Sequence, residues 1–205
     1  MRIAIVGGTG SFGRAMAERI ATLGESVVIG SRDASRAGEI AATLGVEGAT
    51  NEEAVENADL VVLAVRSNAA IETARNLAAA IGTTPLLSVA SALEFTDGGV
   101  LPGQHGYSLA EEIDRIVDAP VAAGLQTLAA VHLTSADPPD EDVLICGEPS
   151  PAKDLSLDLG GRLVNGRAID AGPLANARAL EGMTAVILNV NKRYKVHAGI
   201  RLTGL

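Results

Sequence analysis

The feature that most constrains how this chain folds is a group of three glycines near its start. Gly8, Gly10 and Gly13 follow the spacing G-x-G-x-x-G, directly after the apolar run at residues 2–6 and at the beginning of a stretch with helical spacing, residues 12–23. In this context one glycine permits a tight turn, one lets the backbone approach a pyrophosphate, and one lets helix and strand pack closely. The pattern predicts a helix whose N-terminus meets the phosphates of a dinucleotide. The alternative is an ordinary glycine-rich turn without a ligand.

Strand-like and helix-like segments alternate after this unit. Short apolar or β-branched runs predict strands, and helical spacing predicts helices. The strands are expected at residues 26–29, 59–65 and 86–89, and the helices at residues 34–44, 51–57 and 71–81. Such alternation predicts βαβ units with right-handed crossovers. The expected fold class is therefore α/β, a doubly wound parallel sheet of the Rossmann type.

The second half of the chain is less regular. Residues 96–106, rich in glycine and polar side chains, are predicted to form an exposed loop, and residues 137–142, with two prolines and four acids, a surface connection. Further strands are expected at residues 121–127, 143–146 and 167–170, and helices at residues 108–117, 151–164 and from Pro173 to about residue 190. We expect a Rossmann domain at residues 1–141 that binds the dinucleotide, and a smaller C-terminal lobe at residues 142–205 that closes the cofactor cleft.

Composition and charge exclude several classes of function. Hydrophobic residues make up 47% of the chain, yet there is no Trp and only two Phe and two Tyr, so the core is expected to be aliphatic. The net charge of −9 argues against nucleic-acid binding, which requires a basic face. The single cysteine, Cys146, excludes an internal disulfide and is expected to be a small buried hydrophobe. No secretory signal or membrane-spanning stretch is visible, so we expect a cytoplasmic protein without a membrane partner.

Two kinds of reactive side chain lack a supporting pattern. His105, His132 and His197 are scattered without the spacing of metal ligands, so no metal site is predicted. Ser88 and Ser91 belong to no nucleophile-elbow pattern, so hydrolysis is not indicated.

The residues after the second predicted strand favour NADP(H) over NAD(H). An enzyme that binds NAD usually carries Asp or Glu there to bond the ribose 2′-hydroxyl. This chain has Ser31 and Arg32 instead, with Arg36 one helical turn further on, and its nearby acid, Asp33, is expected just beyond the strand end. A hydroxyl and two guanidinium groups attract a 2′-phosphate, whereas an acid repels it. The alternative, two arginines at a solvated helix start, is less favourable because cations oppose the helix dipole there.

The tips of the next two strands are expected to line the same cleft, because ligands of this fold lie outside the carboxyl ends of the strands. These tips carry Val65, Arg66 and Ala90, and a plain surface role is the alternative for Arg66. The complete NADP(H) site is predicted to consist of Gly8, Thr9, Gly10, Ser11, Phe12, Gly13, Ser31, Arg32, Arg36, Val65, Arg66 and Ala90.

A second distinctive stretch opens the last predicted helix. Residues 170–178 read Asp-Ala-Gly-Pro-Leu-Ala-Asn-Ala-Arg, so that a strand end and a Gly-Pro turn lead into the helix. Arg178, Glu181 and Thr184 are spaced to share one face of that helix. A structural ion pair between Arg178 and Glu181 is the alternative to a functional role for Glu181.

The chain resembles the NADPH-dependent reductases of the deazaflavin coenzyme F420, the F420-dependent NADP oxidoreductases, along nearly its whole length. The resemblance covers residues 1–4 with the Gly-Gly-Thr-Gly turn, residues 21–24 and 30–32, Cys146-Gly147, residues 170–178 and residues 187–189. The turn is shared by many families, whereas the Asp-Ala-Gly-Pro-Leu stretch is much more specific.

The resemblance implies an oxidoreductase that transfers a hydride between the nicotinamide C4 of NADP(H) and the C5 of coenzyme F420, the co-substrate. It implies that Arg178 and Thr184 lie near the stacked rings, and Gln126, Gly172 and Pro173 complete the expected second-ligand site. The protein supplies position and electrostatics for such chemistry, and no catalytic acid or base is required. A homodimer is expected from the resemblance and from the apolar face at residues 183–190.

Three positions depart from the pattern of these reductases. Gln126 stands where they carry His, Arg66-Ser67 stands where they carry Pro-Trp, and Gly182 stands in place of Ser. All three are expected at the second-ligand site. Two other functions therefore stay open: an NADPH-dependent reductase of a flavin or another small acceptor, and a non-catalytic NADP(H)-binding protein.

Overall fold

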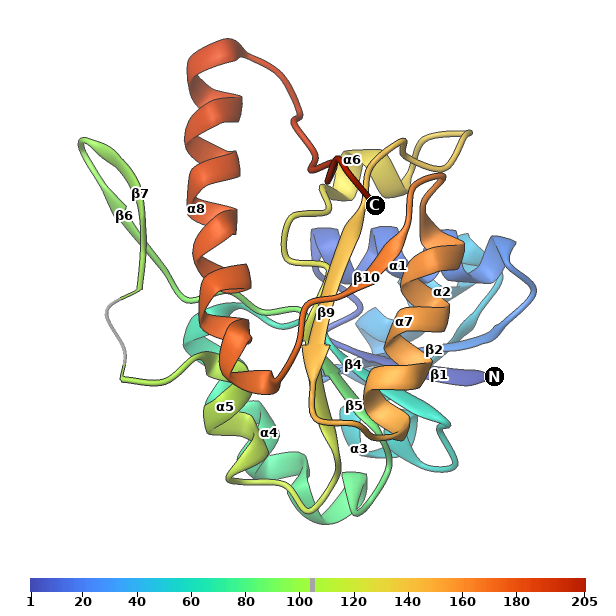
Figure 1. Ribbon diagram of the computed structural model, residues 1–205. Helices are drawn as coiled ribbons and strands as arrows, with labels where there is room; N and C mark the ends of the chain where they lie inside the picture. Colours follow the sequence, from blue (N-terminus) through green and yellow to red (C-terminus); the bar gives the residue numbers. More distant parts are fainter. Residues whose placement is uncertain (104–105) are drawn as a thin grey trace.

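An eight-stranded sheet runs through the centre of the computed structural model, which describes residues 1–103 and 106–205 (Figure 1). Its strand order is β10-β9-β8-β5-β4-β1-β2-β3. These strands are β1 (Arg2–Val6), β2 (Ser26–Ser31), β3 (Glu47–Thr50), β4 (Leu60–Leu63), β5 (Leu86–Ser88), β8 (Val121–Gly124), β9 (Val143–Gly147) and β10 (Ala168–Asp170). The chain passes outward from β1 to β3 and then returns to place β4 on the other side of β1. This reversal at β1 confirms the predicted doubly wound α/β fold.

The sheet is mostly parallel rather than parallel throughout. Among its described strands, only β8 and β9 run antiparallel, and β10 is parallel to β9. The connection from β8 to β9 contains the four-residue helix α6 (Ala130–Leu133). This connection returns to the sheet at the end where β8 finishes, so β9 runs in the opposite direction to β8.

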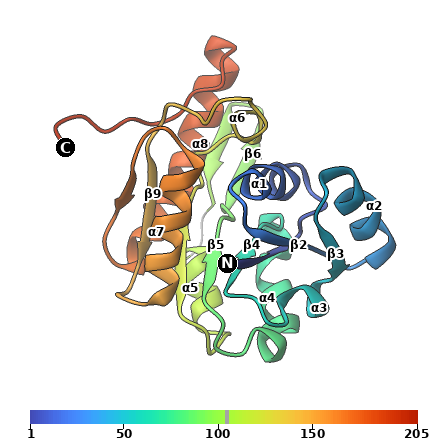
Figure 2. The ribbon, with the colours of Figure 1, turned by 90° about the vertical axis from the view of Figure 1, so that its right-hand side faces the viewer.

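Helices cover both faces of the sheet (Figure 2). One face carries α1 (Ser11–Thr22), α2 (Ala34–Leu44), α6 and α7 (Pro151–Leu163), and the other carries α3 (Asn51–Val55), α4 (Ser67–Ile81), α5 (Leu109–Asp114) and α8 (Ala177–Tyr194). Successive strand residues point to opposite faces, so Ile3 and Ile5 of β1 pack in one layer and Ala4 and Val6 in the other. The core is aliphatic, as the composition predicted. Within the described residues, no helix combines the length and the apolarity needed to cross a membrane.

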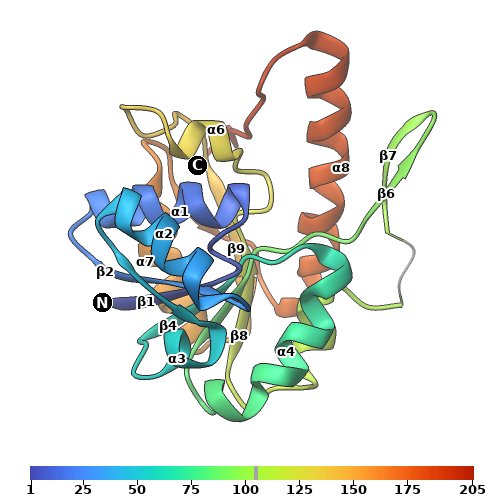
Figure 3. The same cartoon turned by 180° about the vertical axis from the view of Figure 1, so that it is seen from behind.

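The last helix and a β-hairpin stand side by side at one end of the molecule (Figures 1 and 3). The hairpin consists of β6 (Leu93–Thr96) and β7 (Gly99–Pro102). The Asn189 side chain on α8 accepts a hydrogen bond from the Val100 N–H at 2.9 Å and donates one to the Val100 carbonyl at 2.7 Å. Asn189 thus pairs with the edge of the hairpin as a neighbouring strand would.

The hairpin corrects the prediction of a loop over residues 96–102, most of which are exposed as expected, and residues 104–105 of the predicted loop lie outside the described residues. The two-residue connection Asp97-Gly98 is typical of a tight hairpin turn, a signal that the polar composition of this stretch masked. Two isolated strands are only marginally stable. The side chain that supports this hairpin, Asn189, lies far along the chain.

The segment after α8 is tied back to the sheet beside β9. The buried Asp142 carboxylate accepts a hydrogen bond from the Arg167 guanidinium at 2.7 Å and one from the Leu202 N–H at 2.8 Å. These two donors hold the pKa of Asp142 well below its ordinary range. The expected boundary between residues 141 and 142 falls just before β9, and the sheet continues across it. The division into two lobes stays a prediction.

Candidate functional site

The glycine turn lies at the carboxyl end of β1, where side chains have no room. A Cβ added to Gly13 would lie 2.7 Å from the Gly7 carbonyl oxygen, and one added to Gly8 would lie 2.7 Å from Cγ2 of Ile29 on β2. Gly7 itself has a φ of +81°, which L side chains rarely adopt. The turn therefore brings α1 as close to the two strands as the backbone permits.

The first turn of α1 presents its N–H groups outward from this turn. Gly10 is the N-cap, and the first N–H groups of any helix have no acceptor within the helix. Gly10 and Ser11 are exposed, and Thr9 and Phe12 are half-buried. The positive end of a helix dipole attracts phosphate, and phosphate binding at this turn stays a prediction.

The tip of β2 lies beside the turn and carries the predicted cations. The Asp33 carboxylate accepts a hydrogen bond from the Arg36 N–H at 3.2 Å, so it caps α2. The Asp33 N–H in turn donates to the Oγ of the buried Ser31 at 3.2 Å. Arg32 and Arg36 are both exposed at this tip, and the nearby acid, Asp33, is exposed as well but is engaged as the cap of α2.

A cavity of about 680 Å³ opens next to the first turn of α1. It is lined by Phe12, Ala64, Val65, Arg66, Ser67, Asn68, Val89, Ala90, Ser91, Leu93, Phe95, Leu125, Gln126, Leu128 and Thr184, and we call it the Thr184 pocket. It brings together residues predicted for both ligands: Phe12, Val65, Arg66 and Ala90 for the dinucleotide, Gln126 and Thr184 for the second ligand. Six lining residues were not predicted: Ala64, Val89, Leu93, Phe95, Leu125 and Leu128. Leu93 and Phe95 lie in a stretch before residue 96 for which no element was expected.

Thr184 joins α8 to two other walls of the pocket. Its hydroxyl Oγ1 donates to the Gln126 carbonyl at 3.0 Å and lies 2.9 Å from the Oγ of Ser91. The Gln126 side chain is buried, and with its amide oriented to satisfy both neighbours it pairs with the N–H and carbonyl of Gly124 at 3.3 and 3.2 Å. The hydroxyls of Thr184 and Ser91 supply further polar groups to the pocket.

Glu181 lies one helical turn before Thr184 on α8, and its side chain holds the backbone next to Ser91. Its buried carboxylate accepts hydrogen bonds from the N–H groups of Ala92 and Ala110, each at 3.3 Å. Burial raises the pKa of the Glu181 carboxyl. Arg178 donates to the Gly106 carbonyl at 3.4 Å. Among the described residues it forms no ion pair with Glu181, so the alternative of a structural bridge between the two is wrong.

The other residues expected at the second-ligand site lie elsewhere. Arg178 and Gly182 line a separate cavity of about 640 Å³ between α8, the hairpin and the start of α5. Gly172 and Pro173 form the turn that leads from β10 into the 3₁₀ turn Leu174–Asn176, where the Gly172 carbonyl accepts from the Lys153 Nζ at 3.3 Å. Of the expected set, the structure thus gathers Gln126 and Thr184 at one cavity and leaves these four outside it.

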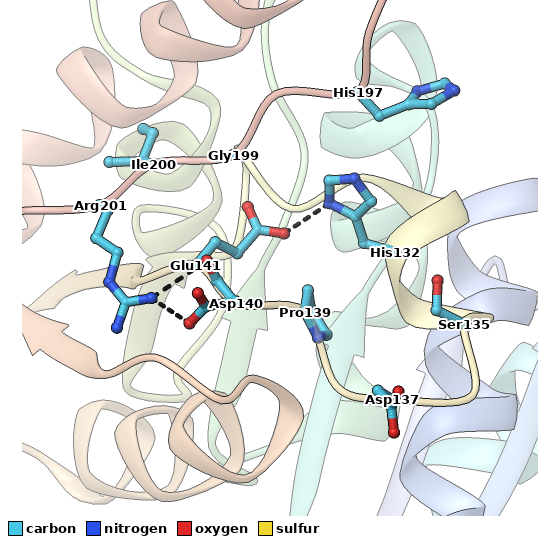
Figure 4. Close-up of a pocket in the computed structure, with 10 residues that line it drawn as sticks. All are labelled: His132, Ser135, Asp137, Pro139, Asp140, Glu141, His197, Gly199, Ile200 and Arg201. Carbon is cyan, nitrogen blue, oxygen red and sulfur yellow. Dashed lines mark hydrogen bonds and ion pairs between the residues drawn. The ribbon is translucent and has the colours of Figure 1, made fainter.

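A third cavity, of about 320 Å³, lies between α6 and the C-terminal segment (Figure 4). The Nδ1 of His132 lies 2.7 Å from the buried Glu141 carboxylate, and the His197 ring meets the His132 ring edge to face. The two histidines, scattered in the sequence, are therefore neighbours, whereas His105 lies outside the described residues. Cys146 is fully buried, which raises its thiol pKa to about 12 and confirms it as a small core residue.

Comparison with known proteins identifies the family of the chain. Residues 2–92 match the family model described as NADP oxidoreductase coenzyme F420-dependent. The whole chain is 34% identical to the F420-dependent NADP reductase of Methanothermobacter thermautotrophicus, covering 96% of it, and 31% identical to that of Methanocaldococcus jannaschii, covering 99% of it. The chain belongs to the F420-dependent NADP reductase family.

Solved structures support the same conclusion for the fold of this family member. A candidate F420-dependent NADP reductase from Arthrobacter sp. FB24 superposes with a TM-score of 0.86 at 26% identity, over 100% of both chains. The three departures from the family pattern now have positions. Arg66-Ser67 and Gln126 line the Thr184 pocket, whereas Gly182 lies in the neighbouring cavity.

Proposed function

We propose that this member of the family is an oxidoreductase that transfers a hydride between NADP(H) and coenzyme F420. The observation that carries the proposal is the Thr184 pocket, because one cavity joins the first turn of α1, the tips of two strands, the hairpin and the middle of α8. Its volume of about 680 Å³ lies in the range typical of small-molecule sites. Identities of 31–35% to F420-dependent NADP reductases favour F420 over other acceptors.

The strand tips on the α1 side are proposed to hold NADP(H). The glycine turn from Gly8 to Gly13 would seat the pyrophosphate, because the two Cβ clashes show a backbone shaped for close approach. Ser31, Arg32 and Arg36 would hold the 2′-phosphate, since the competing acid is engaged as the cap of α2. The nicotinamide half would then reach Val65, Arg66 and Ala90 at the pocket.

The pocket's own residues are proposed to orient the two reactants and exclude water. With both bound, NADPH supplies a hydride from its nicotinamide C4 to the deazaflavin C5, and a proton from water completes the reduced deazaflavin. Leu93 and Leu128 provide apolar walls, and the hydroxyls of Thr184 and Ser91 provide fixed polar contacts. Positioning and a low-polarity cavity are what such a transfer requires of a protein.

The expected assembly is a cytoplasmic homodimer. On α8, Val186 is 60% exposed and Tyr194 is 66% exposed, and a second copy of the chain would cover them. Light scattering coupled to size-exclusion chromatography measures this directly, and the mass of a single chain would contradict it.

The central test is turnover. Purified protein is mixed with NADPH and F420, and bleaching of the visible absorbance of the deazaflavin is followed, with FMN and FAD assayed in parallel. We expect reduction of F420 to be the fastest by a wide margin. Faster reduction of FMN or FAD would favour a flavin reductase, and tight NADPH binding without turnover of any acceptor would favour a non-catalytic NADP(H)-binding protein.

A further inference from the structure

Both phenylalanines of the chain line the Thr184 pocket, although they lie far apart in the sequence. Phe12 belongs to the first turn of α1, and Phe95 belongs to β6. The chain has only two other aromatic residues of the Phe, Tyr and Trp class, both Tyr. Two of the four aromatic residues of the chain therefore line this one pocket.

Phe95 reaches the pocket with most of its surface uncovered. Strand residues two apart face the same side, so Leu93 and Phe95 both point from β6 toward the pocket, and Glu94 between them faces away. Phe95 is 74% exposed, and an exposed apolar side chain contributes little to folding. Single exposed apolar residues are common, but Phe95 and Leu93 stand together at the lining of a cavity, where they can pack against a ligand.

The hairpin that carries Phe95 is held firmly in place. The side chain of Asn189 bonds both the N–H and the carbonyl of Val100, the residue that pairs with Phe95 across the hairpin. The Thr96 hydroxyl also closes the turn by donating to the Gly99 carbonyl at 2.9 Å. Phe95 is therefore presented by a fixed support rather than by a loose loop, as a binding residue requires.

The two rings differ in which reactant they can meet. Phe12 adjoins the glycine turn and so lies on the side of the dinucleotide, whereas Phe95 comes from the hairpin on the acceptor side. A deazaflavin presents a flat, tricyclic ring system, and aromatic side chains pack against such surfaces by stacking or edge to face. We infer that Phe95 is a specificity-determining residue that contacts the ring system of the acceptor and makes the pocket favour planar aromatic acceptors. This inference rests on the proposed function.

The experiment compares steady-state kinetics of the wild type with Phe95→Ala, Phe95→Leu and the control Glu94→Ala. Phe95→Ala is expected to raise the KM for F420 about tenfold while the KM for NADPH and kcat stay near wild type. Phe95→Leu keeps apolar bulk but loses the flat face, so a smaller rise is expected. Glu94→Ala changes an exposed side chain on the same strand that faces away from the pocket, and no rise is expected.

A second probe separates the ring system from the rest of the acceptor. The bare deazaflavin has the same rings without the anionic side chain of F420. Its KM should rise in Phe95→Ala by the same factor as the KM for F420. Each of four results would overturn the inference. These are an unchanged KM for F420, an equal rise in the KM for NADPH, an unchanged KM for the bare deazaflavin, or a different oligomeric state of Phe95→Ala by light scattering. If the wild type fails to reduce F420, the proposed function itself is contradicted, and that result is seen before any variant is compared.

Discussion

The glycine turn and the β6–β7 hairpin face the same pocket, but they are built by different means. The turn is a backbone device, in which a Cβ on Gly13 would lie within 3 Å of backbone atoms of Gly7 and Gly8. The hairpin is a side-chain device, since its position depends on the amide of Asn189 on α8. The turn is complete within a few consecutive residues, whereas the hairpin needs a partner from the other end of the chain. The substitutions below test this contrast.

The largest effect is expected on the backbone side, for Gly13→Ala. The added Cβ would meet the Gly7 carbonyl oxygen at 2.7 Å and the Gly8 Cα at 2.8 Å, so the turn must shift. We expect a loss of about 1–3 kcal/mol in the free energy of unfolding and a rise of about a hundredfold in the Kd for NADPH.

Urea unfolding and calorimetric titration measure these two quantities. Gly38→Ala is the matched control, because a Cβ at that position in α2 would meet no atom within 4 Å. Alanine favours a helix over glycine, so the control should be neutral or slightly more stable. Unchanged NADPH binding in Gly13→Ala would show that the turn does not hold the nucleotide.

An intermediate effect is expected for Arg32→Ala. Loss of a charge-assisted contact should weaken NADPH binding about tenfold and leave NADH binding nearly unchanged, because only NADPH carries the 2′-phosphate. The ratio of the two dissociation constants is the measurement. Arg75→Ala, an exposed arginine on α4, is the control. An equal loss for both nucleotides would remove the basis for NADP(H) selectivity.

The smallest effect is expected for Glu181→Gln, and it is a change in pH dependence. Burial raises the pKa of Glu181 above its ordinary value of 4.5 in the folded protein. A raised pKa in the folded state means stability that is fully present below pH 4.5 and is lost as the pH rises through the folded value. The stability advantage of the wild type over the variant should therefore narrow with rising pH. Urea unfolding at several pH values tests this, and a constant difference would contradict a raised pKa.

The same contrast decides what the sequence can reveal about the fold and the site. The spacing of the glycines, the two cations after β2 and the alternation of strands and helices are local patterns, so the Rossmann-type fold and one wall of the pocket followed from them. Val65, Ala90 and Thr184 could be predicted from strand tips and from the family resemblance, and the structure brings them to one cavity.

The remainder depends on contacts that no local pattern records. The edge strand β3 is short and half exposed, so it lacks an apolar signature. The strand β9 runs antiparallel to β8, and periodicity does not report strand direction. The family resemblance implied that Arg178 and Thr184 lie near the same stacked rings, whereas in the structure they line two separate cavities.

The long helix α8 carries Glu181, Thr184 and Asn189, and these three residues grip the backbone after β5, the wall at Gln126 and the hairpin. A helix is stiff along its axis, so these three contacts move together. Any tilt of α8 would displace the wall at Gln126 and the hairpin at the same time. The position of the nicotinamide and the access of the acceptor to the pocket therefore depend on the same helix. A substitution that removes one of the three contacts should also weaken the other two.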